Sequence, residues 1–410
     1  MPETPPPGAE PLDPVPAPRV LLAGGGTAGH VNPLLATAAA LRDPALGGRE
    51  ETGILVLGTA EGLEADLVPE AGFDMAVVPR VPMPRRPTGD LFMLPRRLSR
   101  AVGAAGEAIE AVDAQVVVGF GGYVSTPAYL AARRAGVPVV IHEQNARPGL
   151  ANRLGASWAA AVALTFASTP LRSSKGRTEV TGLPLRPAIG ELVARLAEPD
   201  GAAAARRSGA AALGLDPRAP TVLITGGSLG AQRLNEVLAA ALPSLSPDLQ
   251  VLHLTGRDKD GPVRAAVEAA VAAGADPGLA ERYHVLDYLV AMEQAYACAD
   301  GVICRSGAGT VAELTALGLP ALYVPLPIGN GEQRLNAADV VAAGGGRLVA
   351  DARLTAADVV DFTALLTRPA ERGAMAAAAA STGVRDGARR LADLIRTVAR
   401  EGCPSPRRKA

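Results

Sequence analysis

The sequence predicts an α/β protein built from two doubly wound lobes that face a central cleft. Short apolar runs alternate with alanine-rich helical stretches, which is typical of parallel sheets covered by helices on both faces. This alternation occurs twice, and each set opens with an apolar run that leads into a glycine-rich turn, at residues 23–30 and 225–230. Ligands of open α/β sheets bind at the carboxyl ends of the strands, so we expect both turns on facing edges of one cleft.

The strand candidates fall into two groups along the chain. The first group covers residues 19–22, 54–57, 75–78, 115–118, 137–141 and 161–164. The second covers residues 221–224, 250–254, 283–286, 301–304 and 321–324. A length of 410 residues agrees with two domains and additional tails.

The predicted organisation has five parts. They are a disordered leader with eight prolines (1–18), a first lobe (19–185), a second lobe (186–372), helices that pack back across the seam (373–403) and a disordered tail (404–410). Between the two strand groups, residues 187–220 predict a helix and a flexible linker.

Composition limits the possible partners. A net charge of −1 and an aromatic content of 3% argue against a nucleic-acid partner. The three cysteines, Cys298, Cys304 and Cys403, lack metal-ligand spacing and are interpreted as reduced structural residues. The sequence has no run of eighteen apolar residues, so we expect a soluble or peripheral protein.

The two glycine turns suggest phosphate binding. Glycine lets a ligand approach the backbone closely, and the following helix N-terminus offers unpaired N–H groups to an anion. Neither turn has the spaced glycines of a dinucleotide site or the Lys-Ser/Thr ending of a P-loop. We therefore expect neither a redox cofactor nor ATP.

Two polar segments in the first lobe are candidates for chemistry. His30 ends the first turn, where its imidazole could take a proton from a hydroxyl; a capping or packing role is the alternative. The run His142, Glu143, Gln144 and Asn145 directly follows an apolar strand, and residues 119–123 form another glycine-rich loop. Buried capping of the next helix is the structural alternative for the polar run.

The second lobe has its own candidates. Small residues from Ser306 to Thr310 follow a strand and precede a helix containing Glu313, whose carboxylate could accept both hydroxyls of a ribose. The stretch 325–336 supplies amide and carboxylate groups suited to sugar hydroxyls, or it is an ordinary solvated loop.

Taken in order, six motifs resemble the MurG family of bacterial N-acetylglucosaminyltransferases. They lie at residues 25–30, 121–123, 142–145, 225–228, 304–313 and 332–336. This family moves N-acetylglucosamine from UDP-N-acetylglucosamine onto undecaprenyl-pyrophosphoryl-N-acetylmuramoyl-pentapeptide (lipid I), giving lipid II for peptidoglycan. The resemblance implies a GT-B fold and an inverting transfer to the C4 hydroxyl of the muramoyl sugar, with neither cofactor nor metal.

The resemblance also assigns site residues. His30 would be the base, with Glu143 or Asn145 as polar helpers. Glu313 would bind the ribose, Leu289 the uracil and Gln333 the sugar hydroxyls. The remaining donor contacts would be Thr27, Ala28, Gly29, Asn145, Arg186, Ser228, Ala308, Gly309, Thr310, Val311, Ala312 and Glu332.

Three positions depart from the family pattern. Ala28 replaces a usual glycine, Leu183 replaces the asparagine usual before Pro184, and Glu332 stands where glutamine is common. Ala28 would narrow the acceptor diphosphate pocket slightly. The substitution at Glu332 leaves its sugar contact open.

A mixed basic and apolar segment predicts contact with an anionic membrane surface. It contains Arg80, Arg85, Arg86, Leu91, Phe92, Met93, Leu94, Arg96 and Arg97. Each basic residue near such a surface contributes about 1 kcal/mol. The expected location is therefore peripheral, on the cytoplasmic face of the bacterial plasma membrane; an ordinary loop and core-facing helix is the alternative.

Three other functions are compatible with the same scaffold. The first is a glycosyltransferase that acts on a natural product or a diacylglycerol lipid. The second is a nucleotide-sugar-binding protein without catalysis, and the third is a nucleotide-sugar epimerase, which converts its donor without an acceptor.

Overall fold

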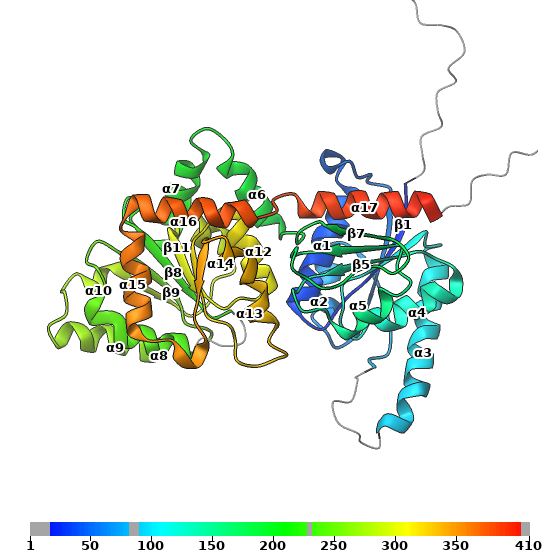
Figure 1. The fold of residues 1–410 in the computed structure, drawn as a ribbon, viewed down its shortest axis with the longest axis horizontal. Coiled ribbons are helices and arrows are strands. Elements are labelled where there is room, and N and C mark those ends of the chain that lie inside the picture. Colours follow the sequence, from blue (N-terminus) through cyan, green and yellow to red (C-terminus); the bar gives the residue numbers. More distant parts are fainter. Residues whose placement is uncertain (1–16, 82–89, 228–231, 403–410) are drawn as a thin grey trace, which may run out of the picture.

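Two parallel sheets form the two lobes of the computed structural model, which describes residues 17–81, 90–227 and 232–402 (Figure 1). Within these ranges the first sheet has the order β3-β2-β1-β4-β5-β6-β7 and the second the order β10-β9-β8-β11-β12-β13. Every pairing is parallel. The predicted doubly wound α/β fold is confirmed.

The first lobe begins with the strand that leads into the first glycine turn. Its strands are β1 (Arg19–Ala23), β2 (Gly53–Gly58), β3 (Asp74–Val77), β4 (Val116–Gly119), β5 (Val139–Glu143), β6 (Ala161–Leu164) and β7 (Arg177–Val180). Its helices are α1 (Ala28–Arg42), α2 (Glu64–Glu70), α3 (Asp90–Ala111), α4 (Ser125–Ala135) and α5 (Leu150–Gly155), with a 3-10 turn at Pro44–Leu46.

The second lobe repeats this plan. Its strands are β8 (Thr221–Thr225), β9 (Gln250–Leu254), β10 (Tyr283–Leu286), β11 (Gly301–Cys304), β12 (Ala321–Tyr323) and β13 (Gly346–Leu348). Helices α6 (Pro187–Leu196) and α7 (Gly201–Leu213) precede it. The others are α8 (Gln232–Ala241), α9 (Asp260–Ala272), α10 (Leu279–Arg282), α11 (Met292–Cys298), α12 (Ala308–Leu317), α13 (Glu332–Asn336), α14 (Ala338–Ala342), α15 (Ala356–Leu366), α16 (Pro369–Thr382) and α17 (Gly387–Gly402), with 3-10 turns at Leu242–Ser244 and Asp351–Arg353.

All eleven predicted strands occur within two residues of their expected ends. Two further strands, β7 and β13, were not predicted, and both lie at sheet edges. Strand β7 reads Arg-Thr-Glu-Val and is partly exposed, while β13 has only three residues. Neither contains the apolar run that identifies a buried strand.

The predicted flexible linker within residues 187–220 is wrong. Helices α6 and α7 together occupy most of that stretch. Helix α7 packs closely on α11, and Ala205 and Ala210 belong to the core of the second lobe. A Cβ atom at Gly209 would lie 2.6 Å from the carbonyl oxygen of Gln294. The alanine and glycine content therefore reflects close helix packing.

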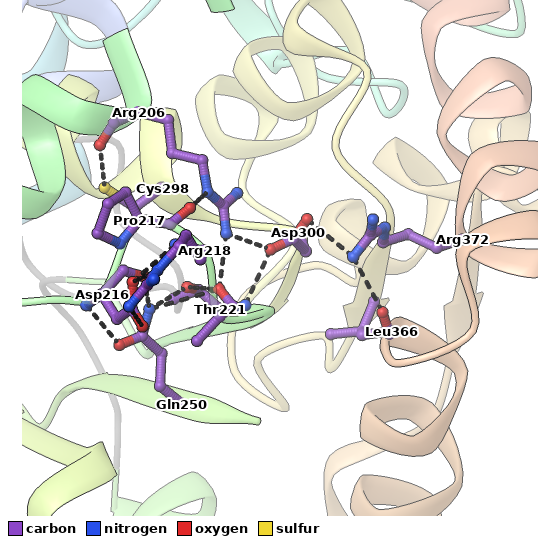
Figure 2. A network of polar contacts seen from close by, with 11 residues as sticks. Arg206, Asp216, Pro217, Arg218, Thr221, Gln250, Cys298, Asp300, Leu366 and Arg372 are labelled. Carbon is purple, nitrogen blue, oxygen red and sulfur yellow. Dashed lines mark hydrogen bonds and ion pairs between the residues drawn. The ribbon is translucent and has the colours of Figure 1, made fainter. Parts of the chain in front are cut away.

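Asp300 ties the amino-terminal edge of the second sheet to two helices (Figure 2). Its carboxylate pairs with Arg206 on α7 at 2.8 Å and with Arg372 on α16 at 3.0 Å. It also accepts the backbone N–H of Thr221 at the start of β8 at 2.9 Å. This network lies at the sheet edge opposite the strand ends where ligands bind in such folds.

The last helix returns to the first lobe. Figure 1 shows α17, drawn in red, lying over the first lobe, whereas α16 lies on the second. Buried residues of α17, including Leu391 and Ile395, share a core cluster with Val20, Leu22 and Val116 of the first sheet. Among the described residues, no helix is long and apolar enough to cross a membrane.

Candidate functional site

The two lobes meet through residues that follow strands β5 and β12. The backbone N–H of Ala146 donates to Oδ1 of Asn336 at 2.8 Å. The amide Nδ2 of Asn336 donates to Oδ1 of Asn145 at 3.3 Å and to the carbonyl of Ser306 at 3.2 Å. Asn145 is thus half-buried at the seam between the lobes, as expected for a residue at a strand end.

His30 lies in the first turn of α1, which begins at Ala28. Its Nδ1 lies 3.1 Å from the carbonyl oxygen of Gly25 and 3.1 Å from Oγ1 of Thr27. A carbonyl only accepts, so Nδ1 carries the proton and Nε2 keeps its lone pair. Nε2 is therefore the basic atom of the ring.

The electrostatic surroundings keep this imidazole neutral. Burial lowers the pKa of His30 below its ordinary value of 6.5, and this effect outweighs the hydrogen bond to Gly25 and the charge of Glu64, which both raise the pKa. A neutral imidazole with a free Nε2 lone pair can accept a proton near pH 7.

The second glycine-rich loop of the first lobe packs beside the imidazole. Gly121 has a φ of +94°, and a Cβ atom there would lie 3.1 Å from Nε2 of His30. A Cβ at Gly122 would lie 2.6 Å from the carbonyl oxygen of Gly25. The glycines therefore permit close contact between the two loops, and Gly121 places no side chain against Nε2.

The polar run expected after the fifth strand begins within that strand. His142 and Glu143 belong to β5, and both are buried together with Gln144. His142 contacts the carbonyl of Gly182 through Nε2 at 3.0 Å. Asn145 alone of the four is half-buried at the seam.

Glu143 organises the loop that precedes α5. Its carboxylate accepts the backbone N–H groups of Asn145 and Gly149, each at 3.0 Å, and the Nδ2 amide of Asn152 at 2.9 Å. Burial raises the pKa of Glu143, although these hydrogen bonds oppose the shift. This arrangement matches the structural alternative, buried capping of the next helix, and its effect on Asn145 is positional.

Glu313 on α12 is the centre of the polar contacts in the second lobe. Arg186, at the N-terminus of α6, donates from Nε to Oε1 at 2.7 Å and from Nη2 to Oε2 at 2.9 Å. The hydroxyl of Tyr296 donates to Oε2 at 3.2 Å. Both oxygens of the carboxylate thus have hydrogen-bond donors, and Tyr296 is a contact that the sequence did not suggest.

The other second-lobe candidates surround the start of α12 and α13. Ala308, Gly309, Thr310, Val311 and Ala312 form the first turns of α12 and not a loop, and the first three are half-buried. Glu332 begins α13, and its side chain accepts the N–H of Asn330 at 3.1 Å. Gln333 accepts the N–H of Leu326 at 3.0 Å, and Leu289 is half-buried against the core.

Several predicted residues carry no structural description. Ser228, Arg85 and Arg86 lie outside the described residues, and nothing is described for the side chains of Leu91, Phe92 and Met93. The adjacent turn residue Gly227 has a φ of +64°. Thr27, Ala28 and Gly29 are exposed at the start of α1.

The segment predicted to contact a membrane includes the start of α3, which extends beyond the body of the first lobe (Figure 1). Arg96 is exposed, whereas Leu94 and Arg97 are half-buried. The guanidinium group of Arg80 lies over the ring of Tyr123, 5.1 Å from its centroid.

A small pocket lies next to the first glycine turn. Its lining includes Gly26, Thr59, Glu64, Arg80 and Tyr123. Within the described ranges, no group of three or more His, Cys, Asp or Glu side chains is arranged to hold a metal ion.

Comparison with protein families gives matches in both lobes. Residues 20–164 match the glycosyltransferase family 28 N-terminal domain, and residues 221–391 match the glycosyltransferase family 28 C-terminal domain. The first matched segment covers β1 to β6 of the first sheet, and the second covers all strands of the second sheet.

Similar proteins carry one recurring name, UDP-N-acetylglucosamine–N-acetylmuramyl-(pentapeptide) pyrophosphoryl-undecaprenol N-acetylglucosamine transferase. The one from Bifidobacterium adolescentis is 49% identical over 388 residues, covering 92% of this chain and 96% of that protein. The one from Clavibacter michiganensis subsp. michiganensis is 50% identical over 392 residues, covering 95% and 99%.

Solved structures agree in fold. The crystal structure of Acinetobacter baumannii MurG has a TM-score of 0.71 and 28% identity, covering 93% of this chain and 99% of that one. UDP-GlcNAc 2-epimerase from Neisseria meningitidis, bound to UDP-GlcNAc, has a TM-score of 0.64 and 15% identity, with coverage of 93% and 100%. At that identity, the likeness to the epimerase extends to the fold alone.

Proposed function

The chain belongs to glycosyltransferase family 28, and on this premise we propose that it transfers N-acetylglucosamine from UDP-N-acetylglucosamine to a lipid-linked N-acetylmuramoyl-pentapeptide. The observation that carries the proposal is the identity of about half to transferases of that name over more than nine-tenths of the chain. The acceptor group would be the C4 hydroxyl of the muramoyl sugar, and the anomeric centre would be inverted.

His30 would be the general base of this reaction. As the acceptor oxygen forms its bond to the anomeric carbon, its proton passes to Nε2 of His30. The bond from the anomeric carbon to the diphosphate breaks, and its electron pair leaves with UDP. Support comes from the Nδ1 contact with Gly25, which leaves Nε2 as the basic atom. Such a base typically contributes a factor of about 10² to 10⁴ in rate.

The donor would bind mainly to the second lobe. We assign Glu313 to the ribose hydroxyls, Leu289 to the uracil, and Gln333 with Glu332 to the sugar. The start of α12, from Ala308 to Ala312, would lie around the uridine, while Thr27, Ala28, Gly29 and Asn145 would complete the site from the first lobe. Because Arg186 holds both oxygens of Glu313, ribose binding exchanges part of this ion pair for sugar hydroxyls.

The leaving diphosphate would be stabilised by protein groups and no metal or other cofactor. The second glycine turn with Ser228 would offer backbone N–H and hydroxyl donors. Arg186, partly released from Glu313 by the ribose, would add positive charge. These donors would act on the negative charge that develops as the glycosidic bond breaks.

The lipid acceptor implies peripheral binding at the anionic cytoplasmic surface of the plasma membrane. The basic and apolar segment from Arg80 to Arg97 is the proposed contact, and the projecting α3 supports it. Nucleic acid is not a proposed partner. Co-sedimentation with vesicles tests this assignment: binding should increase with anionic lipid and weaken in high salt. Binding that ignores lipid charge would contradict the electrostatic part.

The reaction itself is tested with purified protein. Incubation with UDP-N-acetylglucosamine and a short-chain form of the lipid-linked acceptor should yield the disaccharide product and UDP. A parallel incubation with donor alone should leave the donor unchanged, since an epimerase would convert it without acceptor. Absence of disaccharide from folded protein, with both substrates present, would overturn the proposal.

A further inference from the structure

A single peptide group connects a buried carboxylate to the imidazole of His30. The N–H of Gly26 donates to Oε2 of Glu64 at 2.8 Å. The carbonyl of Gly25, which belongs to the same peptide group, lies 3.1 Å from Nδ1 of His30. A continuous hydrogen-bonded chain therefore runs from the carboxylate of Glu64, through the peptide group between Gly25 and Gly26, to the imidazole of His30.

The surrounding loops are shaped around this carboxylate. Glu64 is fully buried at the start of α2, and its Oε1 accepts the backbone N–H of Thr59 at 3.0 Å and the hydroxyl of Thr59 at 2.7 Å. A Cβ atom at Gly25 or Gly62 would lie 2.3 Å or 2.1 Å from a carboxylate oxygen. Glu64 thus has defined partners on both oxygens, and the glycines at positions 25 and 62 leave the space that its carboxylate occupies.

Glu64 is ionised at neutral pH. Burial raises its pKa, but the donors from Gly26 and Thr59 outweigh burial, so the pKa lies below the ordinary value of 4.5. The carboxylate of Glu64 lies beneath the first glycine turn and accepts the hydrogen bond of the Gly26 N–H. The Gly26 N–H is therefore not available to an anion, whereas Thr27, Ala28 and Gly29 at the start of α1 stay exposed.

We propose that Glu64 is a positioning residue that acts on His30 through the peptide group between Gly25 and Gly26. The carboxylate orients and polarises this peptide, whose carbonyl holds the proton on Nδ1 and leaves Nε2 basic. When Nε2 takes the acceptor proton, the same chain stabilises the imidazolium, because hydrogen bonds in series strengthen one another. The inference rests on the proposed function only for its catalytic consequence.

Other ionisable groups surround this site and must be separated from Glu64 in any titration. They are Glu143 on β5, Tyr129 on α4 and, around the adjacent pocket, Glu61, Arg80 and Tyr123. Unlike these groups, Glu64 forms a hydrogen bond to the peptide group that contacts His30.

Nitrogen NMR of the unmodified protein tests the geometry without any substitution. Above the pKa of His30, the ¹⁵N shifts should show the proton on Nδ1. A neutral ring protonated on Nε2 would overturn the proposal. Four histidines are present, and loss of signals in His30→Gln identifies the resonances.

Glu64→Gln tests the charge. We expect the pKa of His30 to fall by on the order of half a unit, because a nearby negative charge is removed. Asp66→Asn is the matched control, since Asp66 is an exposed acid on the same helix, and its substitution should leave the His30 titration unchanged. An unchanged His30 titration in folded Glu64→Gln, established by circular dichroism, would overturn the proposal.

Kinetics distinguish this inference from the proposed function. If both hold, Glu64→Gln should lower kcat about tenfold, leave KM for UDP-N-acetylglucosamine unchanged and move the acidic limb of the pH profile to lower pH. Glu64→Asp, which keeps the charge, should restore part of the rate. If His30 is not the base, Glu64→Gln should still lower the pKa of His30 measured by NMR, but the acidic limb of the pH–rate profile should not move. If Glu64→Gln lowers kcat but changes neither the acidic limb of the pH–rate profile nor the His30 titration, Glu64 has a structural role only.

Discussion

His30 is half-buried and has a lowered pKa, and these properties set its expected behaviour. Replacement by alanine should lower turnover at least about a hundredfold with donor affinity nearly unchanged, because the base acts on the acceptor hydroxyl. If His30 is the base, kcat/KM of the unmodified protein should rise with pH and level off above a pKa below 6.5, since burial lowers the pKa of this imidazole and its neutral form accepts the proton. Turnover and isothermal titration with donor check both points. Near-normal turnover of His30→Ala would remove it as the base.

Substitution of Glu313 should weaken binding of the donor and leave the function of the base unchanged. Glu313→Gln retains the shape but loses the charge that holds Arg186 and accepts the ribose hydroxyls. We expect donor affinity to fall about tenfold or more, since hydrogen bonds to a charged group contribute about 1.5–3 kcal/mol. Titration of UDP into the variant measures this, with exposed Asp361→Asn as control. Unaltered UDP binding would exclude Glu313 from the ribose site.

Residue-level prediction from sequence was limited by tertiary contacts. The sequence makes His30 and Glu313 candidates because each follows a strand and a run of small residues. Glu64 was not identified, since one glutamate in a short helix carries no pattern; its role appears only when the 24–26 turn closes over it. Conversely, Glu143 looked displayed because it follows an apolar strand, yet the strand continues through it and buries it.

At the level of elements, buried strands were predictable and edge strands were not. Central strands such as β1 and β8 are apolar on both faces because helices cover both sides, which leaves a clear signal. Strand β7 is only partly buried and has no such signal. Helix α7 was obscured for a related reason: alanine and glycine permit close packing, but they also occur in linkers.

Asp300 should be important for the stability of the second lobe. It joins α7, α16 and the start of β8 in one network, as Figure 2 shows. Asp300→Ala leaves two guanidinium groups and a backbone N–H without this partner, and should lower the free energy of unfolding by about 2 kcal/mol. Urea denaturation measures the loss. Asp216→Asn, which removes a more exposed carboxylate paired with Arg218, should change stability little; equal effects would argue against a special role for Asp300.

Across the whole molecule, each lobe contains a histidine that is buried in its neutral form. Burial lowers the pKa of His142 to about 4 and that of His253 to about 3. The unfolded chain binds protons on both near pH 6.5, so stability should fall as pH decreases from about 6.5 toward 4. Thermal melts across this range measure the slope, and His253→Asn should reduce it. A slope unaffected by that substitution would assign the acid sensitivity to carboxylates.

Helix α17 makes the stability of the first lobe depend on the end of the chain. Ile395 is fully buried against the first sheet, although α17 follows the second lobe in sequence. Ile395→Ala should lower the free energy of unfolding by about 2–5 kcal/mol, from lost burial and the resulting cavity. Calorimetry should show that the first lobe unfolds at a lower temperature in the variant. Below that temperature, the second lobe should still bind UDP. The exposed Arg400→Ala is the control. If Ile395→Ala lowers the transition that UDP stabilises as much as it lowers the transition of the first lobe, α17 supports both lobes.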